Sequence, residues 1–151
     1  MSDTVSVERL IPAPASEIFA LIADPNRHQD IDGSGTVRHA RGRVERLRLG
    51  STFGMSMKLG VPYAMESTVI EYEEDRRLAW QTRGPTRIGS LVGGRIWRYE
   101  LEPTGDGTLV RETWDLSQES PLTKWGAQRA AKATAKNMAA TLERIEQLVT
   151  S

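Results

Sequence analysis

Glu112 is the residue whose place in the sequence best suits chemistry. In the strand expected around it, Glu112 shares the more apolar side with Val110 and Trp114. A carboxyl group that faces an apolar interior has a raised pKa, and it can act as an acid or a base or anchor a ligand hydroxyl. In the alternative, a bulge turns the side chain to solvent, or Arg95 or Arg98 neutralises it.

Large aromatic and methionine side chains recur along the expected strands and suit the wall of a ligand pocket. Tryptophan and tyrosine combine a flat apolar face with a polar group, and methionine adds an adaptable surface. The residues expected to line the pocket from the strands and one loop are Phe53, Met55, Met57, Trp80, Leu91, Trp97, Tyr99 and Trp114. Ordinary core packing remains the alternative for each of them.

His28, with Asp30 and Asp32 nearby, could form a general-base pair or an oxygen-rich metal site. The spacing does not clearly bring the three side chains to one point, so we favour a solvated capping turn. His39 is the only other histidine, which rules out a three-histidine metal site. We therefore expect no metal ion.

The glycine-containing segment 84–94 connects two expected strands and precedes no helix. It is therefore neither a phosphate-binding loop nor a dinucleotide-binding motif, and we expect no cofactor. The loop is long for a hairpin connection and contains the apolar residues Ile88, Leu91 and Val92. Two interpretations stay open: a flap over the pocket mouth, or a small apolar anchor.

The C-terminal segment 121–151 has apolar residues at steps of three and four, which predicts a long α-helix. The stripe consists of Ala131, Ala135, Met138, Leu142, Ile145 and Val149. Its bulky second half should fill the space against a sheet, while the alanines leave room. We therefore expect a pocket lined by the stripe from Ala131 and Ala135 to Met138 and Leu142.

A second face of this helix is basic. Arg129, Lys132 and Lys136 lie on one side, away from the apolar stripe. Such a row is most often a solvated face. An acidic partner or a membrane surface is the weaker alternative.

The segments before this helix indicate an antiparallel sheet, because adjacent strands are joined by short turns. A first strand (4–11) precedes a helix (16–22) and a short helical turn (25–31). The remaining expected strands are 37–49, 52–59, 63–74, 78–82, 95–103 and 109–116.

Bulk composition excludes several classes of protein. At 151 residues we expect one domain over 1–151. Twenty basic and twenty acidic residues cancel, so no overall field favours nucleic acid. Without cysteine there is no disulfide, thiolate metal site or cysteine nucleophile. We expect a cytoplasmic protein, since no signal pattern or membrane-spanning apolar run is found; oligomeric state stays open.

Two stretches of sequence carry a family resemblance. SVERLIPAPASEIFALIADPNRH contains a Pro-Ala-x-x-Ile-Phe pattern at Pro14, Ala15, Ile18 and Phe19. RIWRYELEPTGDGTLVRETWDLS, residues 95–117, is similar to the family's penultimate hairpin. Together with the order of elements, they resemble the helix-grip fold of the START-like (SRPBCC) superfamily, which includes polyketide cyclases/dehydrases and lipid-transfer domains.

This resemblance implies an α+β fold in which a curved antiparallel sheet grips a long C-terminal helix around an apolar cavity. It also implies a ligand that is a lipid, a polyketide or another hydrophobic small molecule. We expect a binding protein for such a ligand. One alternative is a polyketide cyclase or dehydratase with Glu112 as its acid or base, and another is an interaction or stress-response module whose cavity is incidental.

Overall fold

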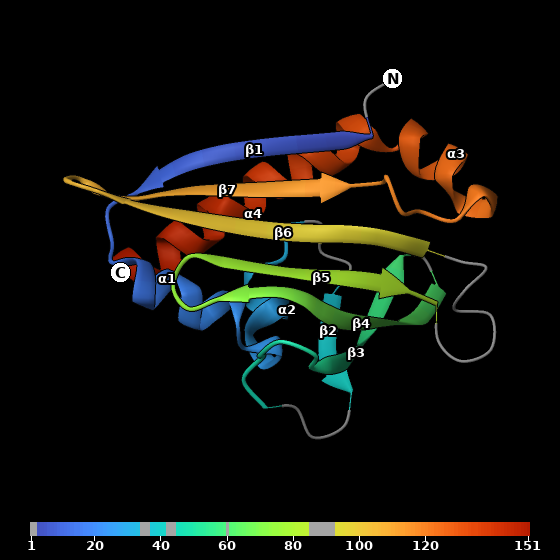
Figure 1. Cartoon of the computed structure of the whole chain (residues 1–151), viewed down its shortest axis with the longest axis horizontal. Helices are drawn as coiled ribbons and strands as arrows, with labels where there is room; N and C mark the ends of the chain where they lie inside the picture. The colour runs from blue at the N-terminus through green and yellow to red at the C-terminus, as the bar shows by residue number, and fades with distance from the viewer. Residues whose placement is uncertain (1–2, 34–36, 42–44, 60, 85–92) are drawn as a thin grey trace.

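A computed structural model of the chain shows an antiparallel sheet with helices packed on one face (Figure 1). It describes residues 3–33, 37–41, 45–59, 61–84 and 93–151, and only the backbone of 37–41, 55–59 and 61–64. Within these residues, seven strands form one sheet in the order β1-β7-β6-β5-β4-β3-β2. The expected α+β helix-grip arrangement is confirmed.

The strands and helices follow the expected order closely. The strands are β1 (Thr4–Ile11), β2 (Val37–Arg41), β3 (Thr52–Leu59), β4 (Val61–Glu73), β5 (Arg77–Arg83), β6 (Gly93–Thr104) and β7 (Gly107–Asp115). The helices are α1 (Ala15–Ile22), the 3-10 turn η1 (Pro25–Arg27), α2 (His28–Ile31), α3 (Pro121–Arg129) and α4 (Ala131–Thr150).

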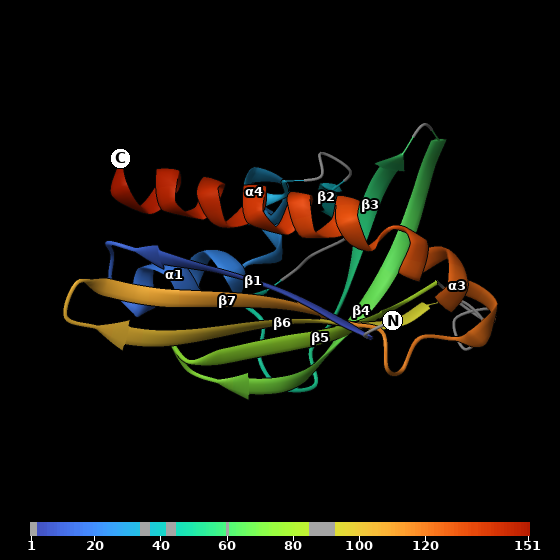
Figure 2. The ribbon, with the colours of Figure 1, turned by 90° about the horizontal axis from the view of Figure 1, so that it is seen from above.

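The sheet curves around α4. Figure 2 shows α4 lying along one face of the sheet, with β3 and β4 rising beside it at one end. The pairing of β4 with β5 shifts register between Val69 and Glu71. Such a bulge bends a strand and increases its twist, which helps the sheet to wrap the helix.

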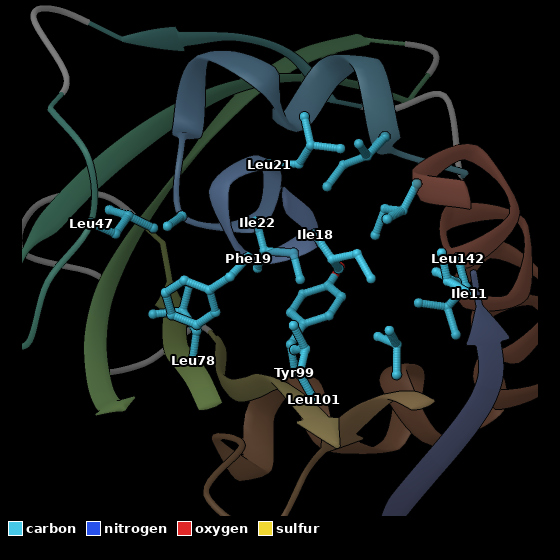
Figure 3. Close-up of a cluster of buried hydrophobic side chains, with 14 of the residues drawn as sticks. Ile11, Ile18, Phe19, Leu21, Ile22, Leu47, Leu78, Tyr99, Leu101 and Leu142 are labelled. Carbon is cyan, nitrogen blue, oxygen red and sulfur yellow. The ribbon is translucent and has the colours of Figure 1, made fainter. Parts of the chain in front are cut away.

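The main apolar core joins α1 to the concave face of the sheet and to the second half of α4. Ile18, Phe19 and Ile22 of α1 are fully buried, and Leu142 of α4 packs in the same cluster as Ile11 of β1 (Figure 3). The predicted apolar stripe of the helix is thereby confirmed as its buried face.

The strand predicted over residues 37–49 was too long. The observed β2 ends at Arg41, and residues 42–44 lie outside the described residues. Leu47 is buried, and its backbone N–H donates to the Ala23 carbonyl oxygen at 2.7 Å. This part of the chain therefore leaves the sheet to cover the end of α1.

The single helix predicted over residues 121–151 is divided in two. Ala130 stands between α3 and α4, and its N–H donates to the Ala127 carbonyl oxygen at 3.0 Å. Alanine is a strong helix former, so local preference does not cause the break. Ala127 is buried against Trp114 and Leu116, which indicates that tertiary packing sets the direction of α3.

Gly33 fixes the chain after α2 against α4. Its N–H donates to the Thr141 hydroxyl oxygen at 2.8 Å. A Cβ atom at Gly33 would lie 2.2 Å from the Asn137 carbonyl oxygen and 2.6 Å from the Thr141 nitrogen. No side chain fits this close approach, and the contact also fixes the position of the neighbouring Asp32.

We predict that Gly33→Ala lowers the free energy of unfolding by about 1–3 kcal/mol, because overpacking against a helix backbone forces the two elements apart. Gly126→Ala is the control: a Cβ atom there meets no atom within 4 Å, and alanine should stabilise α3 by about 0.5–1 kcal/mol. Urea unfolding of both variants tests this. A neutral or stabilising Gly33→Ala would contradict the packing described.

Candidate functional site

The concave face of the sheet carries two rows of paired side chains that extend across neighbouring strands. In one row, Trp80 of β5 lies opposite Trp97 of β6, which lies opposite Trp114 of β7. In the next row, Tyr99 of β6 lies opposite Glu112 of β7. The predicted side of each strand is therefore correct for all five residues.

Glu112 is buried, with 3% of its surface exposed. Along the concave face of β7 it stands between Val110, which belongs to the main core, and Trp114, which belongs to a second apolar cluster. Burial raises the pKa of Glu112 to about 8, a hydrogen bond from Tyr99 acts in the opposite direction, and the charge of Asp32 raises it further. The carboxyl group is therefore mostly protonated at neutral pH.

Both alternatives for Glu112 are wrong. The side chain does not turn to solvent, and the two nearby arginines bind other carboxylates. A guanidinium nitrogen of Arg95 lies 2.7 Å from a carboxylate oxygen of Glu119, and one of Arg98 lies 2.6 Å from a carboxylate oxygen of Glu71. Neither arginine therefore neutralises the buried Glu112 carboxyl group.

Two buried polar atoms on β7 have no hydrogen-bond partner in the described part of the chain. They are Oε1 of Glu112 and Nε1 of Trp114. Both residues are on the same side of the strand, two positions apart. Native proteins rarely leave such atoms unpaired, because each costs about 1–3 kcal/mol. The pair therefore marks a place where a ligand or water oxygen would be stabilised.

Tyr99 shares this environment. Burial and the nearby Glu112 charge hold the pKa of Tyr99 well above its ordinary value. Its hydroxyl therefore keeps its proton and donates to Glu112. Its ring centroid lies 5.8 Å from that of Trp80, so the polar pair adjoins an aromatic wall.

His28 is buried, with 7% of its surface exposed, and the solvated capping turn favoured from sequence was wrong. Its ring stacks on that of Trp80, with the ring centroids 5.1 Å apart, and it meets the Phe53 ring edge-on, with the centroids 5.6 Å apart. Its Nε2 atom lies 2.8 Å from the Ile22 carbonyl oxygen. Burial lowers the pKa of His28, and a carbonyl only accepts, so the ring is neutral with its proton on Nε2.

The effect of Asp32 on the buried Glu112 and Tyr99 was not predicted from the sequence. The half-buried Asp32 ends α2, and its charge acts on the pKa of both Glu112 and Tyr99. Asp30 instead faces solvent and pairs with Arg27 at 2.7 Å. The Asp-Gly turn was visible in the sequence, but its orientation toward the sheet was not. Within the described residues, no group of three potential metal ligands is found.

The remaining predicted pocket residues fall into three groups. Met138 is buried beside Trp114, Leu142 is buried in the main core, and Ala131 packs against the second cluster. Ala135 is half-buried. The side chains of Met55 and Met57 are not among those that the structure describes. Leu91 lies in the segment 85–92, which is outside the described residues. Their binding roles, and the flap, stay predictions.

A shallow hollow of about 230 Å³ lies on the opposite, convex face of the sheet. Its lining includes Glu8 and Arg111, which pair at 3.0 Å, and Arg77 and Glu100, which pair at 3.4 Å. These exposed ion pairs satisfy one another, and the lining of the hollow is more polar than apolar. We therefore place the candidate site on the concave face, around Glu112.

Comparison with known proteins supports the expected family. Residues 2–150 match the family described as polyketide cyclase / dehydrase and lipid transport. An uncharacterized protein of Mycobacterium tuberculosis is 35% identical over 141 residues, which cover 89% of this chain and 59% of that protein. The chain thus spans less than two thirds of this relative's length.

Solved structures with low sequence identity show the same fold. A crystal structure of a Chromobacterium violaceum protein has a TM-score of 0.77 at 16% identity, covering 100% of this chain and 99% of that one. A solution NMR structure of a polyketide-cyclase-like protein from Corynebacterium glutamicum has a TM-score of 0.62 at 20% identity, covering 99% and 93%. Among the described residues, no helix is long and apolar enough to span a membrane.

We predict that Glu112 contributes stability that is lost as pH rises from about 4.5 to about 8. In this range the folded state holds a proton that the unfolded state has lost, since the pKa of Glu112 is raised from 4.5 to about 8. Each pKa unit corresponds to about 1.4 kcal/mol. Urea unfolding across this pH range should show a flatter profile for Glu112→Gln.

Glu17→Gln is the matched control, because Glu17 is exposed on α1. This variant should keep the wild-type pH profile. A Glu112→Gln protein with an unchanged profile would mean that the carboxyl group is hydrated.

Proposed function

Because this chain belongs to the polyketide cyclase/dehydrase and lipid transport family, we propose that it binds an uncharged, oxygen-bearing hydrophobic small molecule between the sheet and α4. The observation that carries the proposal is that the Oε1 atom of buried Glu112 has no hydrogen-bond partner among the described residues. A ligand hydroxyl or carbonyl near this atom would recover the hydrogen bonding that burial removes.

The polar groups favour oxygen functions on the ligand. A protonated Glu112 both donates and accepts a hydrogen bond, and the Trp114 indole N–H only donates. Carbonyl and hydroxyl oxygens match both groups. The aromatic rings of Trp80, Trp97 and Tyr99 supply flat apolar surface for the rest of the ligand.

The charges favour a neutral ligand over a carboxylate. Among the residues that the structure describes, Arg9 and Arg95 lie on the concave side of the sheet, and both are paired. An Arg9 guanidinium nitrogen lies 3.2 Å from a carboxylate oxygen of Glu146 on α4, and one of Arg95 lies 2.7 Å from a carboxylate oxygen of Glu119. Beside Glu112, the charge of Asp32 acts on the site, and His28 is neutral because burial lowers its pKa. A ligand anion would therefore meet like charge without a freely available cation in the described residues.

A second candidate function is dehydration or cyclisation of a polyketide-like substrate. It is favoured by the raised pKa of Glu112, about 8, which suits an acid at neutral pH. Protonated Glu112 would give its proton to a departing hydroxyl, which leaves as water. The resulting carboxylate would then remove a proton from the adjacent carbon, so that a double bond forms and the acid is restored.

We expect Ala135→Trp to reduce binding of Nile red, an uncharged apolar dye, at least about tenfold, because the new side chain fills the proposed ligand volume. Ala139→Trp is the control, since Ala139 is exposed on the same helix. Displacement of the dye should be stronger for 1-naphthol than for 1-naphthoate. Undiminished dye binding in a folded Ala135→Trp protein would remove α4 from the binding site.

For the enzymatic alternative, Glu112→Gln should reduce turnover of an aromatic β-hydroxyketone test substrate about a hundredfold or more, while Nile red binding is retained. Absorbance of the conjugated product measures the rate. If the wild-type protein and the variant react equally, Glu112 is not the acid, and the binding proposal stands alone.

A further inference from the structure

The outer face of the C-terminal helices carries an exposed row that the binding site does not use. Leu122, Trp125 and Arg129 follow one another at steps of three and four residues on α3, Lys132 and Lys136 are four residues apart at the start of α4, and all five are exposed. We call these five residues the α3–α4 stripe. Leu122 is 74% exposed and Trp125 is 68% exposed. Large apolar side chains of this kind on an otherwise charged surface indicate an interaction site.

The exposure of α3 is not a frayed helix end, because the start of the helix is anchored. The Ser120 hydroxyl accepts from the Leu122 N–H, and the Ser120 N–H donates to the Gly93 carbonyl oxygen at 2.6 Å. The fully buried Glu119 carboxylate binds Arg95 at 2.7 Å and accepts from the Thr123 hydroxyl at 2.6 Å.

Further contacts hold the inner side of α3. Lys124 and Gln128 both bind the Asp3 carboxylate, at 3.3 and 3.4 Å. Ala127 is buried in the second apolar cluster. Gly94, next to the anchor, approaches the preceding loop so closely that a Cβ atom would lie 2.3 Å from the Gln118 carbonyl oxygen. The helix therefore presents Leu122 and Trp125 outward from a fixed position.

The sequence that contains the stripe carries charges of one sign. Residues 120–142 contain four basic residues and no acidic one, although the whole chain has a net charge of zero. One of the four, Lys124, pairs with Asp3. The other three, Arg129, Lys132 and Lys136, belong to the stripe. Acidic surfaces are therefore its complement.

The chemistry of the stripe matches a lipid interface. The Arg129 guanidinium lies 4.7 Å from the centre of the Trp125 ring, so a flat apolar surface and a cation are presented together. Tryptophan favours the headgroup level of a bilayer, and lysine and arginine bind anionic headgroups beside it. A five-residue row is also much smaller than the 20–30 residues that each side of a stable protein interface contributes.

We propose that the α3–α4 stripe docks the protein on the surface of an anionic lipid bilayer. Leu122 and Trp125 insert at the interface, and the three cations bind headgroup phosphates. Lys132 and Lys136 alternate along α4 with Ala131 and Ala135 of the proposed ligand wall, so docking would bring the ligand site next to the membrane. The docking itself does not depend on the proposed ligand.

Flotation of the full chain with vesicles tests the proposal. Vesicles of phosphatidylcholine mixed with phosphatidylglycerol should bind the protein, and vesicles of phosphatidylcholine alone should bind it at least about tenfold more weakly. Lys132→Gln and Lys136→Gln should each lower the partition constant about fivefold. Trp125→Ala should lower it about tenfold or more.

Matched controls lie elsewhere on the surface. Leu49→Ala removes another exposed apolar side chain, which is 65% exposed. Arg144→Gln removes an exposed charge about two turns beyond Lys136 on α4. Both should keep wild-type partitioning. Trp125 is the most exposed of the four tryptophans, so a blue shift of fluorescence on anionic vesicles should disappear in Trp125→Ala.

The proposal is overturned if the wild-type protein does not float with anionic vesicles, or if it floats equally with both compositions. It is also overturned if the stripe variants partition like the two controls. In that case the stripe would serve a protein partner or only solvation. None of these results bears on binding of Nile red, so the ligand proposal is tested separately.

Discussion

The burial of one carboxyl group shapes the interior of this protein. Glu112 lies on the concave face of β7, between the main core and the cluster around Trp114. An ionised carboxylate in such a place would cost several kcal/mol, so the group keeps its proton and needs hydrogen-bonding partners. Tyr99 provides one partner from the neighbouring strand, and the second oxygen is left unpaired in the described residues. This unpaired oxygen is the strongest indication of where a polar group of a ligand would bind.

The charges at the margins of the concave face reinforce the neutral interior. Arg9 is held by Glu146 of α4, and Arg95 is held by Glu119 before α3. The same ion pairs also fix the helices against the sheet. His28 remains neutral because burial lowers its pKa. The site therefore combines hydrogen-bonding groups with aromatic surface and with little net charge, which suits a neutral oxygenated molecule.

Much of the fold was predictable because it depends on local periodicity. A strand alternates its sides with a period of two, so the inward direction of Glu112 followed from Val110 and Trp114. The buried face of α4 followed from helical spacing in the same way. The burial of His28 did not follow, because it depends on where a four-residue helix docks. The break at Ala130 has no local signal either, since tertiary contacts of Ala127 and its neighbours cause it.

The central claim is that Glu112 is a buried, mostly neutral acid at physiological pH. NMR titration of the side-chain carboxyl carbon in the full chain, assigned by comparison with Glu112→Gln, measures this directly. We expect a midpoint near the raised value of about 8, well above the ordinary 4.5. A midpoint at 4.5 would contradict it, because it would mean that the carboxylate is solvated, and the concave face would then lack the polar anchor on which the proposed site depends.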